Sequence, residues 1–324
     1  MANRGSSTRR ELLRRSSQAF AVAGLSRTVP MFGQGIGALD RAVIGIRLLG
    51  DTNQLIRQFG VPLVARNPAE SVPESTLVKV TGISGATAGL HPAAPELRAL
   101  FESRALALVM NVAAADPADT GLAFFPNGFS TAAWAASVGH VPSAGGGNLV
   151  TGFAGESGVA LVAADGSGSP AGLPARLLAA GTGENFLARF PSTPLGRRLA
   201  QIASLLQASA TTGVARPLLF CNLSFRSSQA EMWSELSSGM AALYRVTEEL
   251  GIVQKVTTYT SSGSHRLVMG GSVLGGEIYG RNTTTLRDQF EAGIAEWSGV
   301  RASELPRYFP GLGGVPPAKP PFLV

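Results

Sequence analysis

Ile252–Arg281 reads IVQKVTTYTSSGSHRLVMGGSVLGGEIYGR, and this segment decides which fold the chain is expected to adopt. Its first part, Val253–Thr260, is rich in β-branched residues and predicts a core strand. A serine- and glycine-rich loop follows, and the segment ends in a glycine-rich turn. In open α/β sheets, ligands bind where strands end and loops begin. The loop Thr260–Ser264 is therefore a candidate site, and it offers hydroxyl groups and a glycine but no carboxylate.

Strands and helices are expected to alternate along the rest of the chain. Apolar, β-branched runs predict strands at Ala42–Leu49, Thr76–Thr81, Leu106–Val112 and Pro217–Leu223, and two short ones within Asn148–Ala164. Apolar residues three or four apart predict helices at Asn53–Phe59, Ala94–Ser103, Ser130–Val138, from Thr193, from Ser227 or Ser228 to Leu250, and at Leu286–Trp297. This alternation predicts an α/β fold with a mainly parallel central sheet flanked by helices.

Two helices carry clear boundary signals. Thr193 followed by Pro194 predicts a helix that begins with a threonine cap and a proline in its first turn. The second helix is expected to begin at a serine cap and to end at Gly251, because glycine readily adopts the left-handed conformation that closes a helix.

Composition places the chain among globular proteins and limits its partners. The 324 residues are 45% apolar and 15% charged, which is enough to build a sizeable core. The net charge of +6 is concentrated in residues 1–27, where six arginines face one glutamate. The high isoelectric point is thus a property of this leader, and no nucleic-acid partner is expected. No apolar run reaches the roughly 18 residues of a membrane span, and the single cysteine, Cys221, excludes an intrachain disulfide.

The N-terminus looks like an export signal. Ser7–Leu13 reads STRRELL, which resembles a twin-arginine signal, and the apolar segment Ala19–Leu25 follows it. We therefore expect a periplasmic or secreted protein, with a cytoplasmic protein that keeps its basic arm as the alternative. Residues 1–40 are assigned to this leader or arm, 41–305 to one α/β domain, and 306–324 to a tail rich in proline and glycine.

The chemistry-bearing residues are few. The three histidines, His91, His140 and His265, are far apart, and no zinc, nucleotide-binding or nucleophile-elbow motif occurs in the sequence. His91 precedes a proline at a helix entry, and a turn role is expected for it. Only His265 lies in the segment that organises the chain.

The chain resembles the twin-arginine-exported bacterial proteins called domain of unknown function 1501, of the alkaline phosphatase and sulfatase superfamily. The segments that carry the resemblance are Arg9-Arg10, Ile44–Asp51, Leu90-His91-Pro92, Pro194-Leu195-Gly196, and His265 with Leu267–Gly271, Gly275-Gly276 and Ile278–Gly280. The resemblance implies an alkaline-phosphatase-like fold. It also implies a site at the strand ends, where the superfamily holds divalent metals with aspartate and histidine.

The departures from the family pattern fall on those metal ligands. Where the family has Phe-Asp-Thr-His, this chain has Arg226 and Ser228 in place of the aspartate and the histidine. Where the family has Ser-Glu-Phe-Gly-Arg, this chain reads TSSGS around Ser261, and the acidic segment expected before His265 is deleted. Asp51 alone survives as a ligand. A cation at Arg226 would also repel a metal, by about 4 kcal/mol for two unit charges about 4 Å apart at an effective dielectric of about 20.

The sequence therefore predicts a vestigial site formed by Asp51, Arg226, Ser228, Ser261 and His265, with no catalytic residue, no metal and no cofactor. Asp51, Arg226 and Ser261 are expected to meet within about 10 Å at the carboxyl edge of the sheet. The first hypothesis is a pseudoenzyme: a non-catalytic binding or assembly protein with a protein partner.

Two alternatives remain open. Arg226 and the serine/threonine loop could bind an anion without chemistry, or a rebuilt site could hydrolyse phosphate or sulfate esters. If the chain serves as a binding protein, the basic arm and the C-terminal residues 311–324 are the segments expected to contact the partner.

Overall fold

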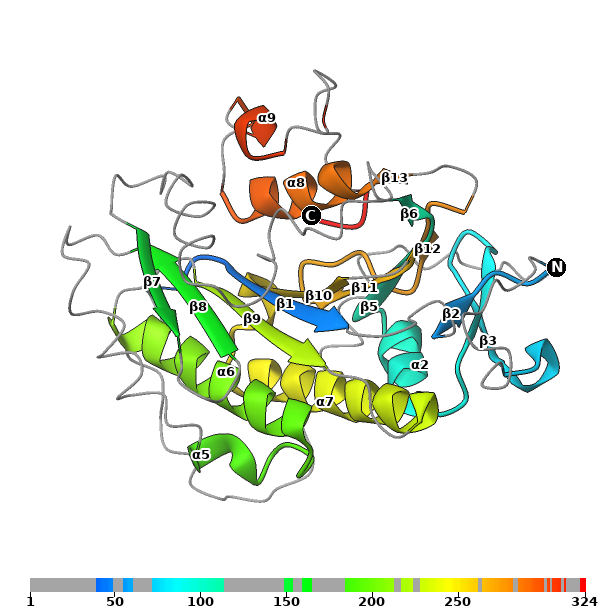
Figure 1. Cartoon of the computed structure of the whole chain (residues 1–324), viewed down its shortest axis with the longest axis horizontal. Helices are drawn as coiled ribbons and strands as arrows, with labels where there is room; N and C mark the ends of the chain where they lie inside the picture. The colour runs from blue at the N-terminus through cyan, green and yellow to red at the C-terminus, as the bar shows by residue number, and fades with distance from the viewer. Residues whose placement is uncertain are drawn as a thin grey trace, which may run out of the picture. The chain divides into compact units, whose positions relative to one another are not determined.

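The structure is a computed structural model of the chain (Figure 1). It describes residues 39–48, 55–60, 72–113, 149–153, 159–164, 184–212, 217–223, 228–261, 264–281, 285–299, 302–303, 305–309, 312 and 321–324. All of these belong to one compact unit, Ile36–Val324.

An eight-stranded mixed sheet forms the centre of this unit. Its order is β12 (Ile278–Tyr279), β5 (Leu106–Val109), β11 (Arg266–Gly270), β10 (Val256–Ser261), β1 (Ala42–Leu48), β9 (Leu218–Leu223), β8 (Val159–Ala164) and β7 (Leu149–Phe153). The pairs β12–β5, β10–β1 and β1–β9 are parallel, and the other four pairs are antiparallel. Six of these strands consequently run in one direction, and β11 and β8 run in the other. The mainly parallel sheet flanked by helices is confirmed.

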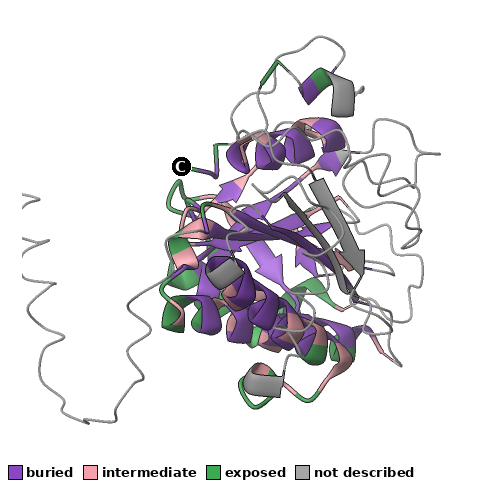
Figure 2. Cartoon of the chain, turned by 90° about the vertical axis from the view of Figure 1, so that its left-hand side faces the viewer, coloured by how far each residue is buried: buried purple, intermediate pink, exposed green. Residues whose placement is uncertain are grey.

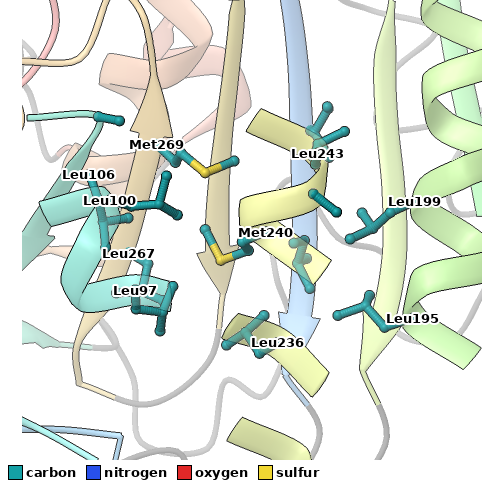
Figure 3. Packing of buried hydrophobic residues seen from close by; sticks show 14 of the residues in the cluster. Leu97, Leu100, Leu106, Leu195, Leu199, Leu236, Met240, Leu243, Leu267 and Met269 are labelled. Atoms are coloured by element: carbon teal, nitrogen blue, oxygen red, sulfur yellow. The ribbon is translucent and has the colours of Figure 1, made fainter. Parts of the chain in front are cut away.

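Helices on one face bury the larger core. α7 (Gln229–Glu249) lies against the middle of the sheet, with α2 (Pro95–Glu102) and α6 (Pro194–Thr212) beside it. Figure 3 shows Leu236, Met240 and Leu243 of α7 pointing at the strands, with side chains of α2 and α6 on either side. The apolar stripe read from the sequence is thus the buried face of α7. Each buried leucine of this kind contributes roughly 1.5–3 kcal/mol.

The opposite face is covered by α8 (Arg287–Trp297), with α9 (Leu305–Tyr308) against it (Figure 2). Phe290 of α8 contacts the ring of Tyr259 edge-on, with centroids 5.9 Å apart, and also contacts Phe322. Phe322 and Leu323 are buried in this core. Phe322 and Leu323 are therefore packed into the domain, and Leu323 forms a bridge with Val273.

Two small sheets accompany the central sheet. β2 (Ile56–Arg57), β4 (Thr87–Leu90) and β3 (Val78–Thr81) form an antiparallel sheet beside α2, in the order β2-β4-β3. β13 (Thr285–Leu286) pairs with β6 (Val112–Ala113) beyond the end of β5. The remaining short elements are the 3₁₀ turns η2 (Glu74–Thr76) and η4 (Val253–Lys255) and the helix α5 (Glu184–Leu187).

Most of the elements expected from the sequence are present. The four core strands, at Ala42, Leu106, Leu218 and Val256, share the central sheet and run in the same direction. The hydroxyls of Thr193 and Ser228 accept backbone N–H groups in the first turns of α6 and α7, as expected for caps. The helix expected at Ser130–Val138 lies outside the described residues.

Three expectations about local structure were wrong. The helix expected at Asn53–Phe59 contains the strand β2 instead, because Ile56 and Arg57 pair with β4, a strand that its small residues did not reveal. The strand expected at Leu106–Val112 is interrupted at Asn111, whose φ of 56° is left-handed. The strand expected from Val253 begins with the turn η4, so that extended backbone starts at Val256.

Candidate functional site

The candidate site lies at the carboxyl edge of the three central parallel strands, β9, β1 and β10. Arg47, near the end of β1, stands opposite Ser261 of β10 on one side and Asn222 of β9 on the other. Asp51 and Arg226 follow β1 and β9 but lie outside the described residues. Their predicted convergence with Ser261 therefore stays a prediction.

Strand alternation directs the polar residues of this edge toward α8. In β1, Ile46 and Leu48 belong to the core under α7, so Arg47 between them faces α8. In β10, Ser261 is two residues from Tyr259, which packs against α8. In β11, Arg266 is two residues from Val268, which belongs to the same core. Arg47, Ser261 and Arg266 thus share one face and one edge of the sheet.

Two donors of this group have no hydrogen-bond partner within the described part of the chain. The Ser261 hydroxyl is buried, with the residue 0% exposed, and the Nε of Arg47 is also shielded from solvent. A buried polar atom that is left without a partner costs about 1–3 kcal/mol. Such atoms in a native fold call for a ligand, water or another segment to satisfy them.

The first two turns of α8 place a buried charged group over the same edge. Arg287, Asp288 and Glu291 are 7%, 3% and 1% exposed, and Nη2 of Arg287 lies 3.3 Å from Oδ1 of Asp288. We call Arg47, Ser261, Arg266, Arg287, Asp288 and Glu291 the edge cluster. It holds three guanidinium groups against two carboxylates.

Arg266 is the most deeply buried cation of the edge cluster. Burial lowers its pKa to about 10, while the nearby Glu291 and Tyr259 act to raise it and Arg287 lowers it further. Arg266 consequently stays protonated at neutral pH. Burial and the charge of Glu291 raise the pKa of Tyr259, so that its phenol stays neutral beside this cation.

Sequence reasoning missed the α8 part of the edge cluster. A signal for it existed: Arg287 and Glu291 occupy the helical positions that continue the apolar stripe Phe290, Ile294 and Trp297. Charged residues on an otherwise buried stripe indicate a polar interior site.

His265 is fixed at the entry of β11 and is neutral at physiological pH. Its Nδ1 accepts a long hydrogen bond, 3.4 Å, from the backbone N–H of Asn111. Burial lowers the pKa of His265 to about 4, against the opposing effect of a backbone hydrogen bond at Ser264. The side chain of Asn111 donates to the carbonyls of Gly280 and Arg281, at 2.8 and 3.0 Å. His265 and Asn111 therefore tie the ends of β5 and β12 to the start of β11.

Ser228, the fifth residue of the expected site, serves as a helix cap. It precedes α7, and its hydroxyl accepts the backbone N–H of Glu231 at 3.2 Å. The side chain is thus engaged in capping the start of α7, which is the role that the sequence also indicated.

The described residues of this edge carry donors that suit an anion. Within that part of the chain, no three histidine, cysteine, aspartate or glutamate side chains are grouped so that they could hold a metal ion. The edge cluster instead offers guanidinium and hydroxyl donors, which bind oxyanions through short charge-assisted hydrogen bonds. None of the helices that the structure describes has the length and apolar character required to cross a bilayer.

Comparison of the chain with protein-family models, with curated proteins and with solved structures finds no match.

Proposed function

We propose that this protein is a non-catalytic binding protein whose edge cluster takes a small oxyanion such as phosphate, sulfate or a sugar acid. The observation that carries the proposal is the pair of buried donors on neighbouring strands, the Ser261 hydroxyl and the Arg47 Nε. Neither has a hydrogen-bond partner among the described residues. An oxyanion presents several acceptors at hydrogen-bond spacing and would satisfy both donors together.

Electrostatics supports the same ligand class. Arg47, Arg266 and Arg287 outnumber the carboxylates Asp288 and Glu291, and the loss of hydration around Arg266 raises the free energy of its charge. An anion at this edge would offset that cost. Hydrogen bonds between charged groups contribute about 1.5–3 kcal/mol each, so two or three of them supply about 3–9 kcal/mol, which corresponds to millimolar to micromolar dissociation constants.

The binding test is isothermal titration calorimetry of the purified protein with phosphate, sulfate and glucuronate. We expect one of these anions to bind, and we expect Ser261→Ala and Arg47→Gln to weaken it by about tenfold each. Arg245→Gln, an exposed charge change on α7, is the control and should leave the affinity unchanged. Binding that is equally strong in all four proteins would refute the edge site.

Hydrolysis of aryl phosphates or sulfates is the alternative outcome. The proposal expects no turnover above background and no stoichiometric zinc, calcium or magnesium in metal analysis of the protein. One equivalent of metal that is lost in Asp51→Ala, or turnover abolished by that change, would instead support a rebuilt hydrolase.

The family resemblance extends the proposal to lineage, location and partner. We infer an alkaline-phosphatase-like scaffold of the domain of unknown function 1501 type, with Arg226 placed where the superfamily has a metal ligand. On this basis Arg226 would pair with Asp51, and Arg226→Asp should destabilise the fold because two carboxylates would then face each other. The same resemblance favours twin-arginine export to the periplasm. It also favours a protein partner for the exported protein.

A further inference from the structure

A second feature of the chain, independent of the edge cluster, lies at the amino end of β5. A hollow of about 380 Å³ is bordered by β3, by the turn that follows it, by the end of α2 and by Gly276. One wall is a continuous run, made of Lys79, Val80 and Thr81 of β3 and of Gly82 and Ile83 of the turn. Since successive side chains of a strand point to opposite faces, a continuous run of this kind means that the strand presents its backbone edge to the hollow.

Hydrogen-bond alternation shows which backbone groups face that edge. Gly82 donates its N–H to Ala86 across the β3–β4 turn. In an antiparallel pair, alternate residues direct both backbone groups to the partner strand. Val80 therefore bonds to β4, whereas Lys79 and Thr81 direct their N–H and C=O groups outward. β3 is the edge strand of its sheet among the described strands.

The charge that lines the hollow is positive. Lys79 and Arg104 are exposed and form no ion pair with any described residue. The carboxylate of Glu102 is already bound to Arg98, with Nε and Oε1 2.7 Å apart. The tip of the turn adds an apolar side chain, Ile83, which is 66% exposed.

Arg104 stands where the backbone favours glycine. Its φ is 64°, and it follows the last turn of α2. The backbone N–H of Arg104 donates to the carbonyl of Phe101, and the N–H of Ala105 donates to the carbonyl of Leu100. This is the Schellman motif, in which glycine is the usual residue at this position. An arginine in left-handed conformation costs roughly 1 kcal/mol.

The same motif at the end of α7 shows the usual solution. There Gly251 has a φ of 68°, and its backbone N–H donates to the carbonyl of Glu248. The N–H of the next residue, Ile252, donates to the carbonyl of Thr247. The chain thus uses glycine at one such position and arginine at the other. Because the arginine is the less stable choice, its side chain is expected to have a function, and that side chain lines the hollow.

The hollow is held open by contacts of its own. Glu277 accepts the N–H and the hydroxyl of Ser84 at 2.7 and 2.8 Å, and Ile83 donates its N–H to Gly276 at 3.0 Å. These bonds fix the turn after β3 to the segment before β12. A ligand would find the strand edge already in place and would not have to order it.

We propose that this hollow binds an extended acidic segment of a partner protein, which adds to β3 as a further strand. The outward backbone groups of Lys79 and Thr81 bond to the segment, as in other cases of strand addition. The side chains of Lys79 and Arg104 bind its carboxylates, and Ile83 contacts an apolar residue between them.

The test uses fluorescein-labelled peptides of eight residues and fluorescence polarisation. An alternating glutamate–valine peptide should bind the full chain, and an alternating lysine–valine peptide should not. Arg104→Gly and Lys79→Gln should each weaken binding by about tenfold, whereas Arg245→Gln should not. Arg104→Gly should also raise the thermal midpoint, which excludes unfolding as the cause of its weaker binding.

Two further experiments distinguish strand addition from other ways of binding the peptide. N-methylation of the peptide on its valines or on its glutamates blocks opposite edges, so one isomer should bind and the other should not. Free glutamate and phosphate should compete weakly. Equal binding of both isomers, no binding of the acidic peptide, or unchanged affinity in Arg104→Gly would overturn the proposal. None of these results bears on anion binding at the edge cluster.

Discussion

Replacing Ser237 by alanine should destabilise the fold far more than the loss of one oxygen suggests. Ser237 lies on α7, is 0% exposed, and caps a different helix, α2. The residue before α2 is Ala94, which has no side chain able to cap it. The hydroxyl of Ser237 accepts the N–H groups of Glu96 and Leu97, both at 3.1 Å, and donates to Oε2 of Glu96 at 2.6 Å.

The magnitude follows from these three bonds. The alanine variant leaves two N–H donors of the first turn without an acceptor, at about 1 kcal/mol each, and removes a bond to a carboxylate that is worth about 1 kcal/mol more. The expected loss is therefore about 3 kcal/mol. α2 should loosen first, because its first turn loses the hydroxyl that caps it.

Urea unfolding followed by far-ultraviolet circular dichroism measures this loss as a lower midpoint with an unchanged slope. The matched control is Ser238→Ala, one residue along the same helix. The Ser238 hydroxyl donates to Ser234 O at the helix surface, so its loss should change stability by less than about 0.5 kcal/mol. If Ser237→Ala and Ser238→Ala unfold at the same urea concentration, the capping argument is wrong.

Three further outcomes are expected. The pKa of His265 is lowered to about 4 by burial, from 6.5 in the unfolded chain, so stability should be full above pH 6.5 and fall by roughly 2 kcal/mol toward pH 4. His265→Gln should flatten that part of a plot of urea midpoint against pH, and an unchanged plot would contradict the assignment. Gly251→Ala should lower the free energy of unfolding by about 1 kcal/mol, because of its left-handed backbone alone. Gly270→Ala should lower it further, because the new Cβ would strike the carbonyl oxygen of Val256. Equal thermal midpoints for the two variants would argue against this. Arg9→Lys with Arg10→Lys should retain a reporter fusion in the cytoplasm, and continued export would show that the arm has another role.

The fold was predictable where local patterns agree with tertiary packing. The apolar stripe of α7 and the β-branched run of β1 have the periods of a helix and a strand, and both became core. β2 was not predictable, since Ile56 and Arg57 are extended through pairing with β4, a distant strand. The α8 part of the edge cluster was missed for a related reason: Glu291 faces Arg266 because the fold places α8 over β11.

The sequence alone indicated the four core strands β1, β5, β9 and β10 and the helices α2, α6, α7 and α8. It also indicated where α6 and α7 begin, and that Ser261 and His265 stand near the ends of strands. These properties depend on residues close together in the chain, whose periodicity and capping chemistry act locally. The tertiary structure alone decided that Arg47 lies opposite Ser261 and that Ser237 caps another helix. It also decided that Arg104 and Lys79 border one hollow. Those relations join residues tens to hundreds of positions apart, and strand register and helix packing bring them together, which no local pattern encodes.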